Sequence, residues 1–185
     1  MRKPRVLKNG ATYHVTVRAN RREMVLHCAA MRQLFLNVVK RAKKKYRFRI
    51  DNFVIMGNHV HLIIRPGDGE SLSAIMQWLL GVFAQAWNRA HFQTGHVWGD
   101  RFFSKIINDC QEYIKTFLYV VYNPSAAHMV RNPEDWEFGG LWHFISGQKD
   151  ILADLPLWIR KIYHAYIRFF CPAVQASAFY NAEIS

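Results

Sequence analysis

The sequence predicts an α+β protein in which an antiparallel sheet carries helices, as in a ferredoxin-like sandwich. Three observations support this prediction. Strand-type alternation and helical spacing of apolar residues follow one another in the order β-α-β-β-α-β. The 185 residues suit one domain, and 51% hydrophobic and 15% aromatic residues are sufficient for a folded core. We therefore expect a single domain over residues 1–171, completed by a C-terminal helix, and a poorly ordered tail over 172–185.

The first half of the chain contains a strand, a helix and a predicted hairpin. Residues 13–17 alternate between apolar and polar side chains, which predicts the first strand. Apolar residues over 31–42 recur at helical spacing and lead into a cationic run, which suits the negative end of a helix dipole. Two apolar segments, 48–56 and 59–65, flank Gly57-Asn58, a pair typical of a two-residue hairpin.

The second half begins with a long helix. Ser71 is the expected N-cap, and the apolar residues over 72–90 form one stripe. Residues 101–107 fit a fourth strand. An antiparallel sheet with both helices on one face would leave its other face free for a ligand.

A third and a fourth helix follow the predicted sheet. Asp109 with Glu112 resembles a capping box and predicts a helix start. We expect this helix to end near Asn123, because Pro124 disfavours helical geometry in the residue before it. The last helix is expected over 155–170.

The charge of the chain indicates a polyanionic partner. The sequence has 25 Lys and Arg against 13 Asp and Glu, a net charge of +12, which is typical of a nucleic-acid-binding domain. No apolar run approaches the roughly 18 residues needed to span a bilayer. The cations lie in several segments and not on one basic amphipathic stretch, so no membrane association is expected. Three widely spaced cysteines are read as buried thiols in a reducing cytoplasm.

His59-Val60-His61 is the sharpest candidate for a site. Residues two apart on a strand point to the same face, so both imidazoles would project together from the sheet while Val60 faces the core. Two imidazoles side by side form two corners of a metal site. The alternative is a strand that carries two solvated histidines, because two ligands do not complete a site.

The third predicted helix offers a nucleophile and a further ligand. At about 100° per residue, four apolar residues share one narrow sector: Ile114, Phe117, Leu118 and Val121. Tyr119 and Asn123 then lie on nearly the opposite side, and residues four apart are neighbours on a helix. An amphipathic surface tyrosine is the plainer interpretation of Tyr119. Together with the histidines, however, the pair indicates phosphoryl transfer, since attack by a tyrosine conserves the phosphodiester energy in a covalent link.

Four segments in register resemble the REP-associated tyrosine transposases, single-tyrosine relatives within the HUH superfamily. They are Tyr13-His-Val-Thr-Val-Arg-Ala-Asn20, Val54-Ile-Met-Gly-Asn-His-Val-His-Leu-Ile63, Gly95-His-Val-Trp-Gly-Asp-Arg-Phe102 and Tyr119-Val-Val-Tyr-Asn-Pro124. The resemblance covers roughly residues 11–147 and implies the HUH nuclease fold.

The resemblance implies roles for individual residues. Tyr119 would be the nucleophile that forms a 5′-phosphotyrosine and frees a 3′-OH. His59 and His61 would bind Mg²⁺ or Mn²⁺, and the side chain of Asn123 would complete the metal site. Tyr122 stays open as a rival nucleophile. Residues 125–130, Ser-Ala-Ala-His-Met-Val, depart from the family pattern by lacking an arginine and a glycine, which puts local DNA contacts in doubt.

The implied substrate is single-stranded DNA beside a short hairpin of the REP type. Nine residues are candidates for contacts with this DNA: Lys43, Lys44, Lys45, Arg47, Arg49, His96, Trp98, Arg101 and Lys105. The cations would contact phosphates, and the two aromatic rings would stack on exposed bases. For the lysine run the alternative is a solvated helix end, and for Trp98 it is a place in the core.

Two other functions remain open at this point. A non-catalytic module could bind hairpin DNA with the same fold and charge. A replication initiator or relaxase could use the same chemistry, although the short chain and the single matched tyrosine argue against it. The protein is expected to act as a monomer or a homodimer.

Overall fold

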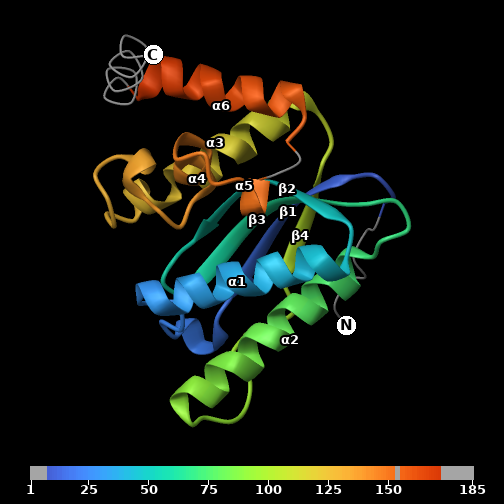
Figure 1. Cartoon of the computed structure of the whole chain (residues 1–185), viewed down its shortest axis with the longest axis vertical. Coiled ribbons are helices and arrows are strands. Elements are labelled where there is room, and N and C mark those ends of the chain that lie inside the picture. Colours follow the sequence, from blue (N-terminus) through green and yellow to red (C-terminus); the bar gives the residue numbers. More distant parts are fainter. Residues whose placement is uncertain (1–7, 153–154, 172–185) are drawn as a thin grey trace.

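The computed structural model describes residues 8–152 and 155–171 and contains one four-stranded antiparallel sheet (Figure 1). Its strands are β1 (Thr12–Arg18), β2 (Phe48–Ile55), β3 (His59–Pro66) and β4 (Phe103–Ile107), in the order β2-β3-β1-β4. This order confirms the ferredoxin-like prediction, because the two βαβ halves interleave and place β1 and β3 at the centre.

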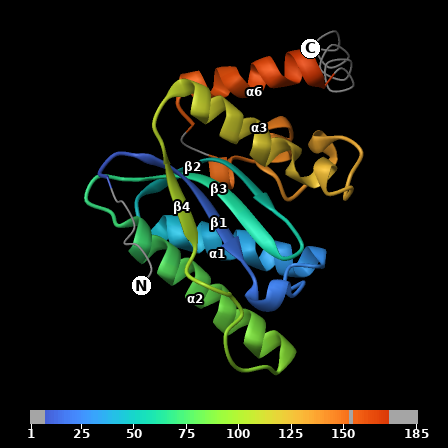
Figure 2. The same ribbon diagram turned by 180° about the vertical axis from the view of Figure 1, so that it is seen from behind.

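Helices cover both faces of the sheet, in two different ways (Figures 1 and 2). Helices α1 (Ala29–Lys45) and α2 (Leu72–His91) lie together on one face. Helix α3 (Cys110–Ala126) packs on the other face, over β2 and β3, and α6 (Leu157–Phe170) lies above it. The expectation of one free face is therefore wrong for half of the sheet, and within residues 8–152 and 155–171 no helix packs over the β1 and β4 side.

The main core lies between the sheet and the first two helices. Val15 and Val17 of β1 and Val60 and Leu62 of β3 are at most 1% exposed, as the alternation of these strands predicts. Three aromatic rings from the helical side complete this layer, with centroids 5.2–6.1 Å apart: Phe35, Phe83 and Trp98.

The predicted hairpin and caps are present. β2 and β3 pair from Ile55 and Val60 outward, so Gly57-Asn58 lies in the turn between them. The Ser71 hydroxyl accepts a hydrogen bond from the Ala74 amide at 3.3 Å.

The predicted end of α3 is wrong. The helix continues through Pro124 to Ala126. A proline removes one amide donor but leaves the carbonyls ahead of it available. The Ala127 amide still donates to the Asn123 carbonyl at 3.1 Å, and the Met129 amide donates to the Pro124 carbonyl at 3.0 Å.

The predicted last helix, α6, begins at Leu157 and packs against both α3 and β2. Tyr163 of α6 is fully buried, with its ring stacked on Phe144 and edge-on to Phe117. Before it come the short helices η2 (Pro133–Asp135), α4 (Gly140–Ile145) and α5 (Lys149–Leu152). The Ile55 amide donates to the Phe138 carbonyl at 3.0 Å, so this segment covers the edge strand β2.

Three further expectations can be compared with the structure. The predicted tail over 172–185 lies outside the described residues. All three cysteines are free, but the expectation of buried thiols holds only for Cys171, since Cys110 is exposed and Cys28 partly buried. No helix in residues 8–152 or 155–171 combines the length and apolarity needed to cross a bilayer.

Candidate active site

The two histidines of the His-Val-His segment lie at the start of β3, on the face that α3 covers. In the antiparallel register, Arg18 of β1 is opposite His59, and Thr16 is opposite His61. His61 is only 3% exposed and His59 is partly buried. The expectation of an exposed pair is thus wrong for His61, because α3 folds back over this end of the sheet.

The ring nitrogens of His61 have unequal surroundings. Nδ1 lies 3.0 Å from Nε2 of His14 and 3.1 Å from Oγ1 of Thr16. Nε2 is buried and has no hydrogen-bond partner among the described residues. Burial, followed by the neighbouring His59, His14 and Arg18, lowers the pKa of His61 to about 3. The imidazole is therefore neutral at physiological pH, the form in which histidine binds a metal.

His59 lies between its own turn and α3. Its Nδ1 is 2.7 Å from Oδ1 of Asn58. The Asn123 side chain also hydrogen-bonds to this imidazole, which opposes the lowering of its pKa by burial and by Arg18. Asn123 of α3 and His59 of β3 thus meet although they are far apart in the sequence.

The two candidate tyrosines point in different directions. The Tyr119 ring lies edge-on to His61 at a centroid distance of 5.2 Å and edge-on to His14 at 5.8 Å. Half of its surface is exposed. Tyr122 instead packs edge-on against Tyr166 of α6 at 5.8 Å and hydrogen-bonds to it. Only Tyr119 lies beside the histidines.

The donor set at this site consists of two imidazoles and one side-chain amide. Within residues 8–152 and 155–171, no group of three or more His, Cys, Asp or Glu side chains is arranged to hold a metal ion. The set nevertheless fits a divalent ion, because the buried Nε2 of His61 has a free position and an amide oxygen suits a hard cation.

Comparison with known proteins places this geometry in a family. Residues 8–121, which contain the sheet, both histidines and Tyr119, match the family model described as "Transposase IS200 like". The chain belongs to this IS200-like transposase family.

Two relatives support the more specific resemblance. The REP-associated tyrosine transposase of Escherichia coli (strain K12) is 24% identical over 136 residues, which cover 70% of this chain and 75% of that protein. The solved structure of a REP-associated tyrosine transposase bound to a REP hairpin has 22% sequence identity and a TM-score of 0.67. The aligned region covers 80% of this transposase-family chain and 86% of the chain in the solved structure.

The structure places the lysine run of this IS200-like chain far from the histidines. Lys43, Lys44 and Lys45 end α1, on the opposite face of the sheet and near the far end of β3. The Lys43 ammonium donates to the Ile151 carbonyl at 2.8 Å, and that of Lys45 lies 5.6 Å from the Trp78 ring centroid. Lys44 is exposed, as expected for a solvated helix end.

The two arginines of this group have protein partners. The Arg47 guanidinium donates to the Asp68 carbonyl at 3.1 Å and is largely exposed. Nε of Arg49 donates to Oδ1 of Asp51 at 2.5 Å, and this carboxylate is fully buried. Arg49 therefore stabilises the protein interior.

The 95–102 segment is divided between core and surface. Trp98 is 9% exposed, packs against Phe83, and donates through its indole N–H to the Leu80 carbonyl at 2.9 Å. The core alternative is therefore correct for Trp98. His96 and Arg101 line a hollow of about 480 Å³ between this segment and α2.

Sequence reasoning missed His14 and Thr16 of β1 and Phe103 of β4, which lie on the same face of the sheet as His61. Phe103 is 61% exposed and lies opposite Thr16, on the open half of the sheet face. His14 lies opposite Lys105, whose ammonium pairs with Glu112 at 2.5 Å. The alternation of β1 was a usable signal, because it places His14, Thr16 and the exposed Arg18 on the face opposite the core.

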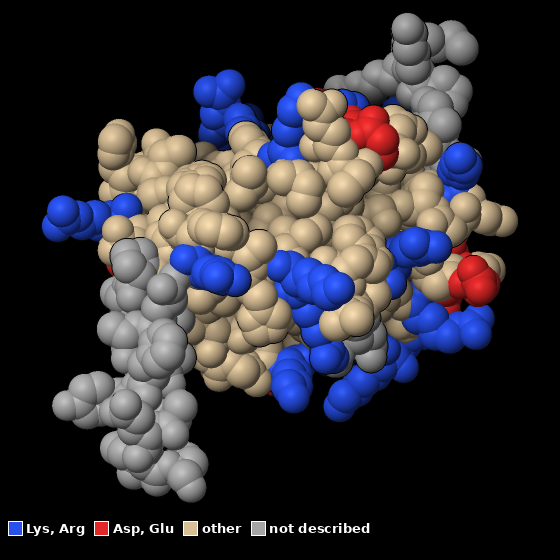
Figure 3. All heavy atoms as spheres, turned by 90° about the horizontal axis from the view of Figure 1, so that it is seen from above, with Lys and Arg blue, Asp and Glu red and all other residues tan. Residues whose placement is uncertain are grey.

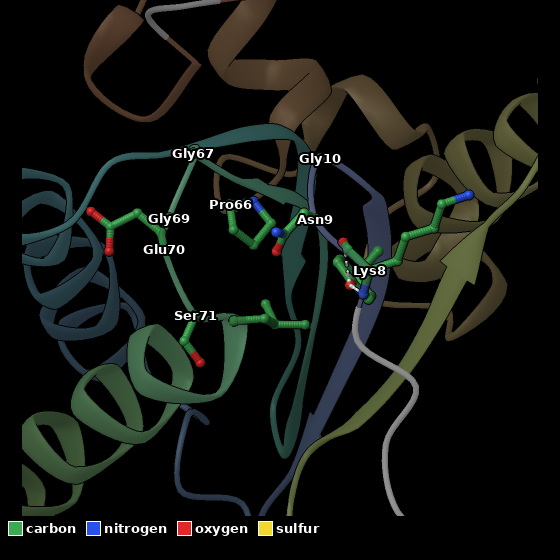
Figure 4. Close-up of a pocket in the computed structure, with 10 residues that line it drawn as sticks. Lys8, Asn9, Gly10, Pro66, Gly67, Gly69, Glu70 and Ser71 are labelled. Carbon is green, nitrogen blue, oxygen red and sulfur yellow. Dashed lines mark hydrogen bonds between the residues drawn. The ribbon is translucent and has the colours of Figure 1, made fainter.

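The molecule has two further surface features. Over the α6 side of the molecule, Lys and Arg side chains surround a largely uncharged centre, with few acidic groups (Figure 3). A pocket of about 300 Å³ lies where β1 begins, β3 ends and α2 begins (Figure 4). Its lining includes Lys8, Asn9 and Glu70 but no histidine or cysteine, and it is at the opposite end of β3 from His59.

Proposed function

We propose that this chain is a metal-dependent single-strand DNA transposase that cuts beside DNA hairpins and rejoins strands, with Tyr119 as nucleophile. The observation that carries the proposal is the position of the Tyr119 ring, 5.2 Å from the ring of His61 and half exposed to solvent. Tyr122 is held against α6 instead, which favours Tyr119 over its rival.

His59, His61 and Asn123 would hold the divalent ion, Mg²⁺ or Mn²⁺. The ion would polarise the scissile phosphate and stabilise charge on the leaving oxygen. The donor types support this assignment, because an amide oxygen suits both ions and the two imidazoles favour Mn²⁺ over Mg²⁺.

Tyr119 would carry out the covalent step. Its phenolic oxygen bonds to phosphorus, the bond from phosphorus to the 3′-oxygen breaks, and the phenol proton is lost to solvent while the 3′-oxygen gains a proton. The product is a 5′-phosphotyrosine and a free 3′-OH. A 3′-OH can reverse the step on another strand, because the phosphodiester energy is retained.

The proposed partner is single-stranded DNA next to a hairpin. The REP hairpin bound by the solved relative and the net charge of +12 support this partner. The cut strand would lie over the open half of the sheet face, where exposed Phe103 and Arg18 flank the site. The three free cysteines suit action in a reducing cytoplasm.

The decisive experiment is covalent capture of DNA. Full-length protein, Tyr119→Phe and Tyr122→Phe are incubated with hairpin-containing oligonucleotides and Mn²⁺, and protein–DNA adducts are separated by denaturing electrophoresis. We expect adducts from the unmodified protein and from Tyr122→Phe only. Adducts from Tyr119→Phe would overturn the assignment. Hairpin binding without any adduct would favour the non-catalytic module.

A further inference from the structure

The two ring nitrogens of His61 differ in their hydrogen-bond partners. Thr16 lies directly opposite His61 in the pairing of β1 with β3, and His14 lies diagonally across, opposite Ile63. Both side chains reach the same ring atom, Nδ1, at 3.1 Å and 3.0 Å. No described residue reaches Nε2.

This asymmetry selects one tautomer of the imidazole. A neutral histidine carries one ring proton, and the nitrogen without it is an acceptor. A proton on Nδ1 can be accepted by Nε2 of His14 and by the hydroxyl of Thr16. A proton on Nε2 would be buried without an acceptor, which costs free energy. The surroundings therefore favour the proton on Nδ1 and a lone pair on Nε2.

We propose that His14 and Thr16 are positioning residues that hold the His61 proton on Nδ1 and so present the Nε2 lone pair to the metal. The metal part of this inference rests on the proposed function. Metal-binding histidines generally donate their second ring N–H to an oriented acceptor, which fixes the ring. Here the acceptors come from the neighbouring strand, so the pairing of β1 with β3 itself orients the ligand.

His14 has a second contact that fits this role. Its ring lies nearly parallel to that of His61 and edge to edge with it, with centroids 5.2 Å apart and an interplanar angle of 26°. Its edge also meets the Tyr119 ring at 5.8 Å. One side chain thus contacts both the proposed ligand and the proposed nucleophile and fixes their relative position.

The tautomer can be measured directly. Long-range ¹H–¹⁵N correlation spectra of the metal-free full chain, with His61 assigned by comparison with His61→Gln, report which ring nitrogen carries the proton. We expect the Nδ1–H form in the unmodified protein and a shift toward Nε2–H in Thr16→Val combined with His14→Phe. An Nε2–H form in the unmodified protein would overturn the inference.

The effect on the metal site is measured by titrating the protein with Mn²⁺. The electron paramagnetic resonance signal of free Mn²⁺ decreases as the ion binds and reports the affinity. We expect Thr16→Val and His14→Phe each to weaken Mn²⁺ binding by about 10-fold or more. Thr16→Ser keeps the hydroxyl and is expected to bind within about twofold of the unmodified protein. Thr12→Val is the matched control, because Thr12 lies on the same face of β1 opposite Ile107 and away from His61.

Thermal unfolding separates positioning from simple damage. If the double variant melts like the unmodified protein and binds Mn²⁺ equally well, the inference is wrong. If the unmodified protein binds Mn²⁺ no better than His61→Ala, the proposed metal site fails. The spectra then still decide whether His14 and Thr16 hold the proton on Nδ1.

Discussion

Asp51 of β2 is fully buried. It lies at a register shift in the pairing of β2 with β3, on the side of the sheet that α3 and α6 cover. Oδ2 of Asp51 accepts a hydrogen bond from the Tyr113 hydroxyl at 3.2 Å, and its carbonyl accepts one from the Tyr163 hydroxyl at 3.0 Å. Burial raises the pKa of Asp51, while Arg49 and Tyr113 oppose this shift. The carboxylate therefore depends on Arg49 for compensation of its charge.

We expect Arg49→Ala to lower the free energy of unfolding by roughly 2–4 kcal/mol, because removing one partner of a buried pair leaves the other uncompensated. Urea unfolding at neutral pH measures this change. Arg47→Ala is the matched control: this guanidinium is largely exposed, and its loss should change stability by less than about 0.5 kcal/mol. Equal effects of the two substitutions would contradict the structural role of Arg49.

At the scale of elements, α3 brings the candidate residues of the site together. It presents Tyr119 and Asn123 to the histidines on one side and Tyr122 to Tyr166 of α6 on the other. In the described part of the chain no helix covers the strand β4 on this face, so its outward residues lie next to the proposed path of the cut strand. Phe103 is the largest apolar group there.

We expect Phe103→Ala to weaken single-strand DNA binding by roughly fivefold or more, since base–aromatic stacking contributes about 1–3 kcal/mol per base. Fluorescence anisotropy with a labelled oligonucleotide measures this loss. Phe92→Ala is the control, because Phe92 is 97% exposed but lies at the end of α2, away from the histidines. A similar loss for both variants would indicate a nonspecific effect of exposed aromatic rings.

At the scale of the whole molecule, buried histidines link folding to pH. His143 of α4 is 2% exposed and packs edge-on against Phe53 of β2. Burial is the main cause, and the charge of Lys40 the second, of a pKa lowered to about 4 from the usual value of 6.5. Between these pH values the unfolded chain binds more protons than the folded protein, so acidification through this range destabilises the fold.

We expect His143→Gln to reduce this pH dependence. On going from pH 7.5 to pH 5, the unmodified protein should lose roughly 1–2 kcal/mol more unfolding free energy than the variant. Urea unfolding at several pH values gives both curves. Parallel curves would show that His143 does not contribute to the acid sensitivity.

The sequence alone determined the order of elements and the pairing of His59 with His61 on one strand face. Alternation and helical spacing are local properties that depend on the geometry of a few consecutive residues. They can therefore be recognised without knowledge of the fold. The same local reasoning placed Tyr119 beside Asn123 on one side of α3. It failed at Pro124, where hydrogen bonds across the following turn continue the helix.

Only the tertiary structure decided which of these residues meet. The packing of α3 over β2 and β3 buries His61, brings Asn123 to His59, and separates Tyr119 from Tyr122. The same packing explains why Arg49 pairs with a buried carboxylate instead of facing solvent. Arg49 and Asp51 are close in the sequence, but the α3 and α6 residues that bury Asp51 are far from it in the chain. The free energy of these long-range contacts comes from burial and complementary charge, which a single sequence does not locate.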